Sequence, residues 1–251
     1  MTSLGPPIDH FPSTHRTWIA EHLTIISDEP SSASAHDAHR TLSAYIMNRY
    51  NEPLRAYVSA AALRDLGEPQ ELVASFFARS FDNSILLQRW ISSGIALRRW
   101  LMNAISLHCR GLRRDLRRNQ SRVRTESELG ATGSIDAISS QASHSAERAF
   151  DRAWALAITN EAHEIARMAC VERERAGDYE AFRLHIVDGA EHVDIAQRLN
   201  ITRTQSVNAV RRVASMMRDE VRELLRAEGV AMEDLDQAVA ELIQLSSDTS
   251  P

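Results

Sequence analysis

Hydrophobic residues recur every three or four positions over long stretches of this chain, which is the period of an α-helix with one buried face. One such stripe, with a spacing of four, is Leu42, Ile46, Tyr50, Leu54 and Val58. Pro53 lies inside this stripe and predicts a kink or a restart of the helix. Further helices are predicted from Pro69 to Phe81 and over 97–118, and the less periodic region between them predicts a loop with a short helix.

The composition agrees with a helical protein, because only nine glycines and seven prolines interrupt 251 residues. A hydrophobic content of 43% with 25% charged residues is typical of a globular domain. No apolar run approaches the roughly 18 residues of a membrane span, and the first residues do not resemble a secretion signal, so we expect a cytoplasmic protein without membrane contact. Cys109 and Cys170 are isolated, without the paired spacing of a zinc site or of a redox dithiol, and are expected to be buried thiols.

Residues 119–147 are rich in Ser, Gly, Ala and Thr and have no sustained periodicity, which predicts an interdomain linker. The predicted fold class is therefore all-α, with two helical domains joined by a flexible linker. The expected parts are a loosely attached N-terminal segment 1–36, a first domain 37–118, the linker 119–147, a second domain 148–226 and an acidic C-terminal helix 227–251.

A helix-turn-helix is predicted over 191–217, where two short periodic segments flank a tight turn. Ile195 lies on the buried face of the first helix, and Asn200 occupies the position that needs a left-handed backbone. Thr202 and Gln205 have the spacing of a capping box, so the second helix should begin near Arg203. Its predicted buried stripe is Val207, Val210, Val213 and Met217.

That stripe leaves the other face of the second helix exposed, with side chains that can reach base edges and phosphates. These candidate DNA-binding residues are Arg203, Thr204, Gln205, Asn208, Arg211 and Arg212. Periodicity alone fits an ordinary helical hairpin equally well.

The helix predicted over 97–118 favours the nucleic-acid interpretation. Nine arginines and one acid, Asp115, lie between Arg98 and Arg124, whereas a solvated helix normally mixes its charges. Such a surface suits the phosphates of DNA. The chain has no lysine, so all 29 of its basic residues are arginine, whose guanidinium fork matches phosphate and guanine.

We found no signature of an enzyme in the sequence. It has no glycine-rich phosphate loop, no nucleophile elbow and no histidine or cysteine cluster with the spacing of metal ligands. We therefore expect no catalysis, no cofactor and no metal.

Four segments together resemble the extracytoplasmic-function sigma factors of bacterial RNA polymerase. RYNEPLRAYV (49–58) and EPQELVASFFARSF (68–81) are similar to the first helices of sigma region two, and LRRWLMNAISLHCRGLRRDLRR (97–118) to its promoter helix. EHVDIAQRLNITRTQSVNAVRRV (191–213) resembles sigma region four. FPSTHRTWI (11–19), FFARSF and the acidic last helix are most like a subgroup of this family common in planctomycetes.

The resemblance implies core RNA polymerase and promoter DNA as partners, with an anti-sigma factor as a further candidate. It implies that the exposed face of the second helix reads the −35 element. The loop from Asp82 to Gly94 would capture an unstacked −10 base. The −10 strand would be held by Arg98, Arg99, Arg110, Arg113, Arg114 and Arg117. The polymerase would be contacted by Glu71, Leu72, Ser75, Phe76 and Arg79.

The chain departs from the family on the promoter helix, where Leu107 and Gly111 stand in place of the usual Asn and Asp. Two alternatives therefore stay open. One is a dimeric helix-turn-helix regulator of transcription, and the other is a degenerate sigma-like scaffold that binds proteins. Trp90 and Trp100 could stack on melted bases, but tryptophans at such positions are more often part of the core.

Overall fold

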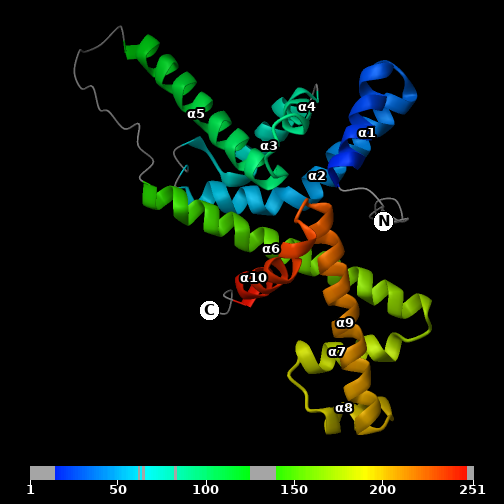
Figure 1. Ribbon diagram of the computed structural model, residues 1–251. Coiled ribbons are helices and arrows are strands. Elements are labelled where there is room, and N and C mark those ends of the chain that lie inside the picture. Colours follow the sequence, from blue (N-terminus) through cyan, green and yellow to red (C-terminus); the bar gives the residue numbers. More distant parts are fainter. Residues whose placement is uncertain (1–14, 62, 64–65, 82–83, 125–139, 248–251) are drawn as a thin grey trace. The chain divides into compact units, whose positions relative to one another are not determined.

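A computed structural model describes residues 15–61, 63, 66–81, 84–124 and 140–247 (Figure 1). The described residues form helices and no strand, so the predicted all-α class is confirmed. None of the described helices is both long and apolar enough to cross a membrane. The helices are α1 (His15–Asp28), α2 (Ala33–Ala60), α3 (Pro69–Phe81), α4 (Ile85–Ile91), α5 (Leu97–Arg124), α6 (Ser140–Glu172), α7 (Ala176–Ile186), α8 (His192–Leu199), α9 (Arg203–Ala227), the short 3-10 helix η2 (Met232–Asp234) and α10 (Leu235–Ser247).

The chain divides into two compact units, Met1–Trp154 and Ala155–Pro251, so that α6 belongs to both. Helices extend into both ends of the segment 119–147 that was predicted as a linker. α5 continues to Arg124, and α6 already begins at Ser140. The rest of that segment lies outside the described residues. Ala, Arg and Glu between 140 and 149 are good helix formers, and the first turns of α6 are anchored where Ala146 and Phe150 are buried.

In the first unit, α2 is a single helix although it contains Pro53, so the predicted restart does not occur. The ring removes one backbone hydrogen bond, but Tyr50 and Leu54 on either side of it are completely buried and hold both halves in one core. The apolar faces of α3 and α5 complete this core.

The N-terminal segment is more firmly attached than the sequence suggested. Residues 15–28 form α1, whose Ile19 and Leu23 are buried against the unit, and α2 begins at Ala33, inside the segment expected to precede it. Ser32 caps α2 by accepting a hydrogen bond from the backbone N–H of Ala35 at 3.0 Å. This cap explains why a Ser- and Ala-rich stretch starts a helix here.

In the second unit, α7 and α8 pack on the first half of α9, and α10 packs on its second half (Figure 1). One hydrophobic cluster joins α7, α8 and α9 with the end of α6, and its buried members include Phe182, Leu184, Ile195, Val210 and Val213. The helix-turn-helix therefore has its own core.

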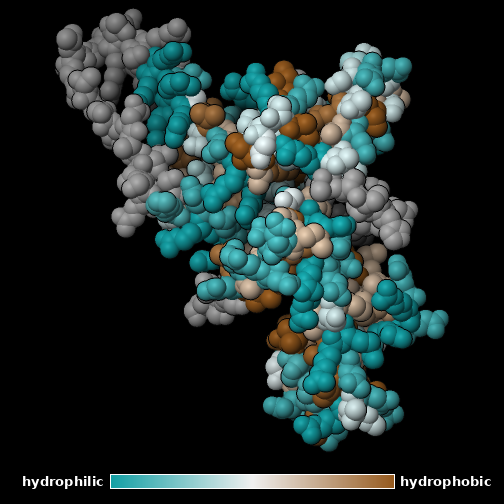
Figure 2. Space-filling view, in the orientation of Figure 1, coloured by the Kyte–Doolittle hydropathy of each residue, from teal (hydrophilic) through white to brown (hydrophobic). Residues whose placement is uncertain are grey.

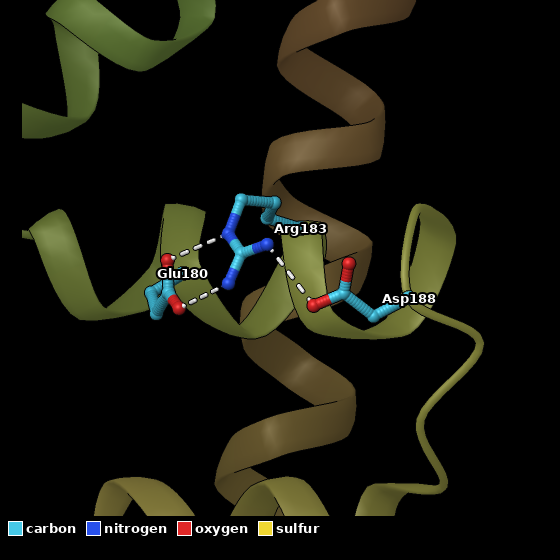
Figure 3. A network of polar contacts seen from close by, with 3 residues as sticks. All are labelled: Glu180, Arg183 and Asp188. Atoms are coloured by element: carbon cyan, nitrogen blue, oxygen red, sulfur yellow. Dashed lines mark hydrogen bonds and ion pairs between the residues drawn. The ribbon is translucent and has the colours of Figure 1, made fainter.

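Two arginines of this unit tie neighbouring segments together. Arg183 donates to both carboxylate oxygens of Glu180, at 3.0 and 2.8 Å, and to Asp188 at 3.0 Å, which ties α7 to the turn before α8 (Figure 3). At the other end of α9, Arg222 donates to Asp236 of α10 at 2.6 Å. The C-terminal helix predicted from residue 227 begins only at Leu235, because α9 continues to Ala227. It packs through Leu235, Val239 and Leu242 while its acids stay at the surface.

Candidate nucleic-acid interface

The turn between α8 and α9 has the geometry that the sequence predicted. Asn200 adopts the left-handed conformation, with φ 53° and ψ 48°, and the backbone N–H of Ile201 donates to Ala196 at 3.0 Å. The capping box is complete: the N–H of Gln205 donates to the Thr202 hydroxyl at 3.1 Å, and the N–H of Thr202 donates to the Gln205 side chain at 2.7 Å. This pair fixes the start of α9 at Arg203.

The buried stripe of α9 differs from the prediction at both of its ends. Ser206 is completely buried, whereas Val207 and Met217 are half-buried. The hydroxyl of Ser206 lies 3.1 Å from Nδ1 of His192 on α8, so its polar group is satisfied inside the core. Hydrophobicity favoured Val207, but the helical spacing from Val210 and Val213 identifies position 206 equally well.

The side chains predicted to meet DNA are all exposed on the outer face of α9. Two of them have partners within the unit. Gln205 closes the capping box, and Arg212 donates from Nε and a terminal nitrogen to Asp178 of α7, at 3.0 and 3.2 Å. Arg203, Thr204, Asn208 and Arg211 make the rest of the face.

The arginines of α5 fall into two groups. At its first turn, Arg98 lies over the ring of Trp154, 4.6 Å from the ring centroid, and Arg99 donates to Glu147 of α6 at 3.2 Å. Asp151 of α6 lies 4.0 Å from Arg98; burial raises the pKa of its carboxyl, while Arg98 opposes that rise. Arg98 and Arg99 are thus engaged with α6, which the sequence did not predict.

The second group lies further along α5, where the helix carries exposed charge. Arg110, Arg114 and Arg117 are exposed, and Arg113 is half-buried. At about 100° per residue these four positions fall within an arc of roughly 100° on one side of the helix. Figure 2 shows hydrophilic side chains over this end of α5. We call these four residues the arginine arc.

A groove of about 580 Å³ lies next to this part of α5, between α3, α4 and α5. Its lining combines aromatic and apolar side chains with arginines from two helices, and includes Phe76, Arg79, Arg89, Trp100, Asn103 and Leu107. Trp100 is half-buried here rather than fully part of the core, and its Nε1 has no hydrogen-bond partner. Trp90, by contrast, is a core residue whose Nε1 donates to Ile95 at 2.8 Å.

Leu107 and Gly111 of α5 both line this groove. Leu107 is 63% exposed, and a Cβ added at Gly111 would meet no atom within 4 Å. Polar side chains at positions 107 and 111 would give the groove hydrogen-bonding groups. Leucine and glycine instead leave this wall of the groove apolar and open.

The set predicted to contact polymerase does not form one surface. Leu72 and Phe76 are buried in the core, 4% and 1% exposed, so they offer almost no surface to a partner protein. Both residues belong to the apolar stripe of α3 that packs on α2 and α5, so their side chains point into the core. Glu71 and Arg79 are exposed, and Ser75 is half-buried, with its hydroxyl 2.9 Å from Nε2 of His108 on α5.

The loop expected to capture a base is partly described. Within Asp82–Gly94, residues 82–83 lie outside the described residues, 85–91 form α4, and Gly94 has a φ of 72° that suits glycine. Three residues of α4, Ile85, Leu86 and Arg89, line the groove. Among the described residues, no group of three or more His, Cys, Asp or Glu side chains is placed to hold a metal ion.

Comparison of the chain with protein-family models, with curated proteins and with solved structures found no match.

Proposed function

We propose that this protein is a promoter-specificity subunit of RNA polymerase, of the extracytoplasmic-function sigma type, that acts in the cytoplasm. The observation that carries the proposal is the occurrence of two basic surfaces in one chain, one on each compact unit. One is the outer face of α9, and the other is the arginine arc beside an aromatic groove. A subunit that recognises two separate promoter elements needs two such surfaces.

The helix-turn-helix is suited to reading the −35 element in the major groove. Arg203, Thr204, Asn208 and Arg211 are exposed near the start of α9, the part of a recognition helix that contacts base edges and neighbouring phosphates. The capping box and the αL turn at Asn200 hold this face on a rigid core. Gln205 and Arg212 act mainly within the protein, as their internal hydrogen bonds indicate.

The arginine arc and the groove are suited to the −10 strand. The arc supplies cations for phosphates, and the groove offers Trp100 for stacking and Asn103 for hydrogen bonds to an unstacked base. The loop containing α4 takes part through Ile85, Leu86 and Arg89. The protein has no catalysis of its own in this proposal, because core RNA polymerase performs the chemistry.

The experiment that tests the proposal has two steps. Purified protein is first tested for binding to core RNA polymerase, and the complex is then tested for run-off transcription on fragments of the native genome. We expect stable binding, transcription from a subset of fragments, and weak binding of duplex DNA by the protein alone, since two weak contacts gain affinity only when polymerase fixes both. A stable dimer that ignores polymerase and binds a palindrome tightly would establish the regulator instead.

One observation favours the scaffold as a second candidate. Leu107 and Gly111 give the groove an apolar, open wall where a promoter helix would offer hydrogen bonds to bases. Binding of polymerase or of an anti-sigma factor, without transcription from any fragment, would establish this alternative.

A further inference from the structure

We propose that α1 is a latch for the groove, and that Arg16 is the positioning residue through which it acts. In this inference α1 holds α4 against the first unit, and α4 in turn sets the position of one groove wall. The functional part rests on the proposed role of the groove as the site of the −10 strand, whereas the structural part concerns only contacts within the first unit.

The first step is that α4 has little stability of its own. It has seven residues, and helices of that length are marginal in water. Its N-cap residue, Ser84, is in the left-handed conformation with a φ of 55° and makes no side-chain capping bond. The helix therefore depends on tertiary contacts.

Arg16 supplies such a contact at the C-terminal end of α4. Its guanidinium donates a hydrogen bond of 2.7 Å to the carbonyl of Ile91, the last residue of the helix. The same group lies 5.4 Å from the ring centroid of Trp90. A cation at this end satisfies an unpaired carbonyl and is favoured by the helix dipole.

A second contact joins the two helices further along. Nε2 of Gln88 donates to the hydroxyl of Ser27 at 3.3 Å. The other side of α1 is fixed to the unit, because Ile19 is completely buried and the ring of Trp18 packs on Tyr45 with centroids 5.0 Å apart. α1 is thus a firm support for α4.

The α1 contacts and the groove use different faces of α4. The side chains of Gln88 and Trp90 meet α1, whereas Ile85, Leu86 and Arg89 line the groove. At about 100° per residue, the mean directions of the two sets differ by roughly 170° around the helix axis. Loss of the α1 contacts would let α4 fray or shift, and the groove wall would move with it.

Hydrogen–deuterium exchange on the full chain tests the latch without any partner. In Arg16→Ala, we expect the amides of 85–91 to exchange about tenfold faster than in the wild type, with no change at 42–58 in α2. Arg16→Lys keeps a charge and a donor and should restore part of the protection. Arg40→Ala is the matched control, because Arg40 is exposed on α2 and pairs with Asp37, three residues earlier on the same helix.

Unchanged exchange in α4 of Arg16→Ala would overturn the latch. If that variant fails to fold, as judged by circular dichroism, Gln88→Ala replaces it, and a smaller but measurable increase in exchange is expected. Equal exchange in Gln88→Ala and wild type would then count against the latch.

The positioning role is tested on the complex with core polymerase and promoter DNA. A fluorescent base analogue in the −10 strand reports opening, and we expect about fivefold less opened complex with Arg16→Ala, with unchanged contacts to the −35 duplex. Faster exchange with normal opening would leave α1 a purely structural support and overturn the positioning role. If the wild-type chain does not bind polymerase, the proposed function fails together with that role, while the exchange experiment still decides whether the latch exists.

Discussion

Arg212 of α9 and Asp178 of α7 form a two-pronged ion pair, with Nε 3.0 Å from one carboxylate oxygen and a terminal nitrogen 3.2 Å from the other. The two residues are 34 positions apart in the sequence. The pair joins the first turn of α7 to α9, and it engages one of the arginines on the face that we propose for DNA. Arg211, the preceding residue, is exposed and forms no such ion pair with the residues that the structure describes.

The neighbouring arginines give a matched pair of variants. We expect Arg211→Ala to reduce the salt dependence of binding between the polymerase complex and promoter by about one unit of slope, because one phosphate contact is lost. Arg212→Ala should leave the slope unchanged and cost about 0.5 kcal/mol of stability, as for a partly exposed pair. If both variants reduced the salt dependence equally, the ion pair between Arg212 and Asp178 would have to break when the protein binds DNA.

The capping box predicts a local effect on stability. Thr202→Ala removes the acceptor for the Gln205 N–H and should lower the free energy of unfolding by about 1 kcal/mol. Thr204→Ala, at the exposed second residue of the same helix, is the control and should be neutral or slightly stabilising, because alanine has the higher helix propensity. Urea titration followed by circular dichroism measures both, and equal stabilities would contradict the role of the cap.

His108 predicts a pH dependence. Burial lowers the pKa of its imidazole, and the nearby Arg79 cation lowers it further. The folded protein then binds fewer protons than the unfolded chain, whose histidine pKa is about 6.5. The stability contributed by neutral His108 is therefore complete above about pH 6.5 and is lost as the pH falls through the lower folded pKa.

Unfolding free energies measured at several pH values in wild type and in His108→Gln test this. The variant should lose less stability on acidification than the wild type does. His192, whose pKa is also lowered by burial and then by His185, should behave in the same direction. Parallel pH curves for wild type and His108→Gln would assign the acid sensitivity elsewhere.

Leu107 predicts an effect on function without one on the fold. Because the side chain is 63% exposed, Leu107→Asn should change stability by no more than about 0.5 kcal/mol. An amide in the groove adds a hydrogen bond for a base edge, worth about 1 kcal/mol, and should raise the amount of opened promoter about fivefold. Leu116→Asn, also exposed on α5 but outside the groove, is the control. Equal amounts of opened promoter with wild type and with Leu107→Asn would argue that the groove does not contact the −10 strand.

The sequence by itself determined the features that depend on near neighbours. The helix periods, the left-handed Asn200 and the Thr202–Gln205 box were all predicted, because each depends on residues no more than about a turn apart. The exposure of the outer face of α9 followed from the same spacing. The arginine-rich character of α5 was equally visible, since composition along one helix needs no tertiary information.

Tertiary structure decided which of those side chains are engaged and where a groove forms. Arg98, Arg99 and Arg212 meet acids or rings that lie 34 or more positions away, and nothing in their local pattern marks those partners. Leu72 and Phe76 became core, and α1 became a support for α4, because burial depends on how separate helices pack together. Local hydrogen bonds and periodicity are encoded within a few residues, whereas ion pairs between helices and grooves exist only after distant apolar faces have come together.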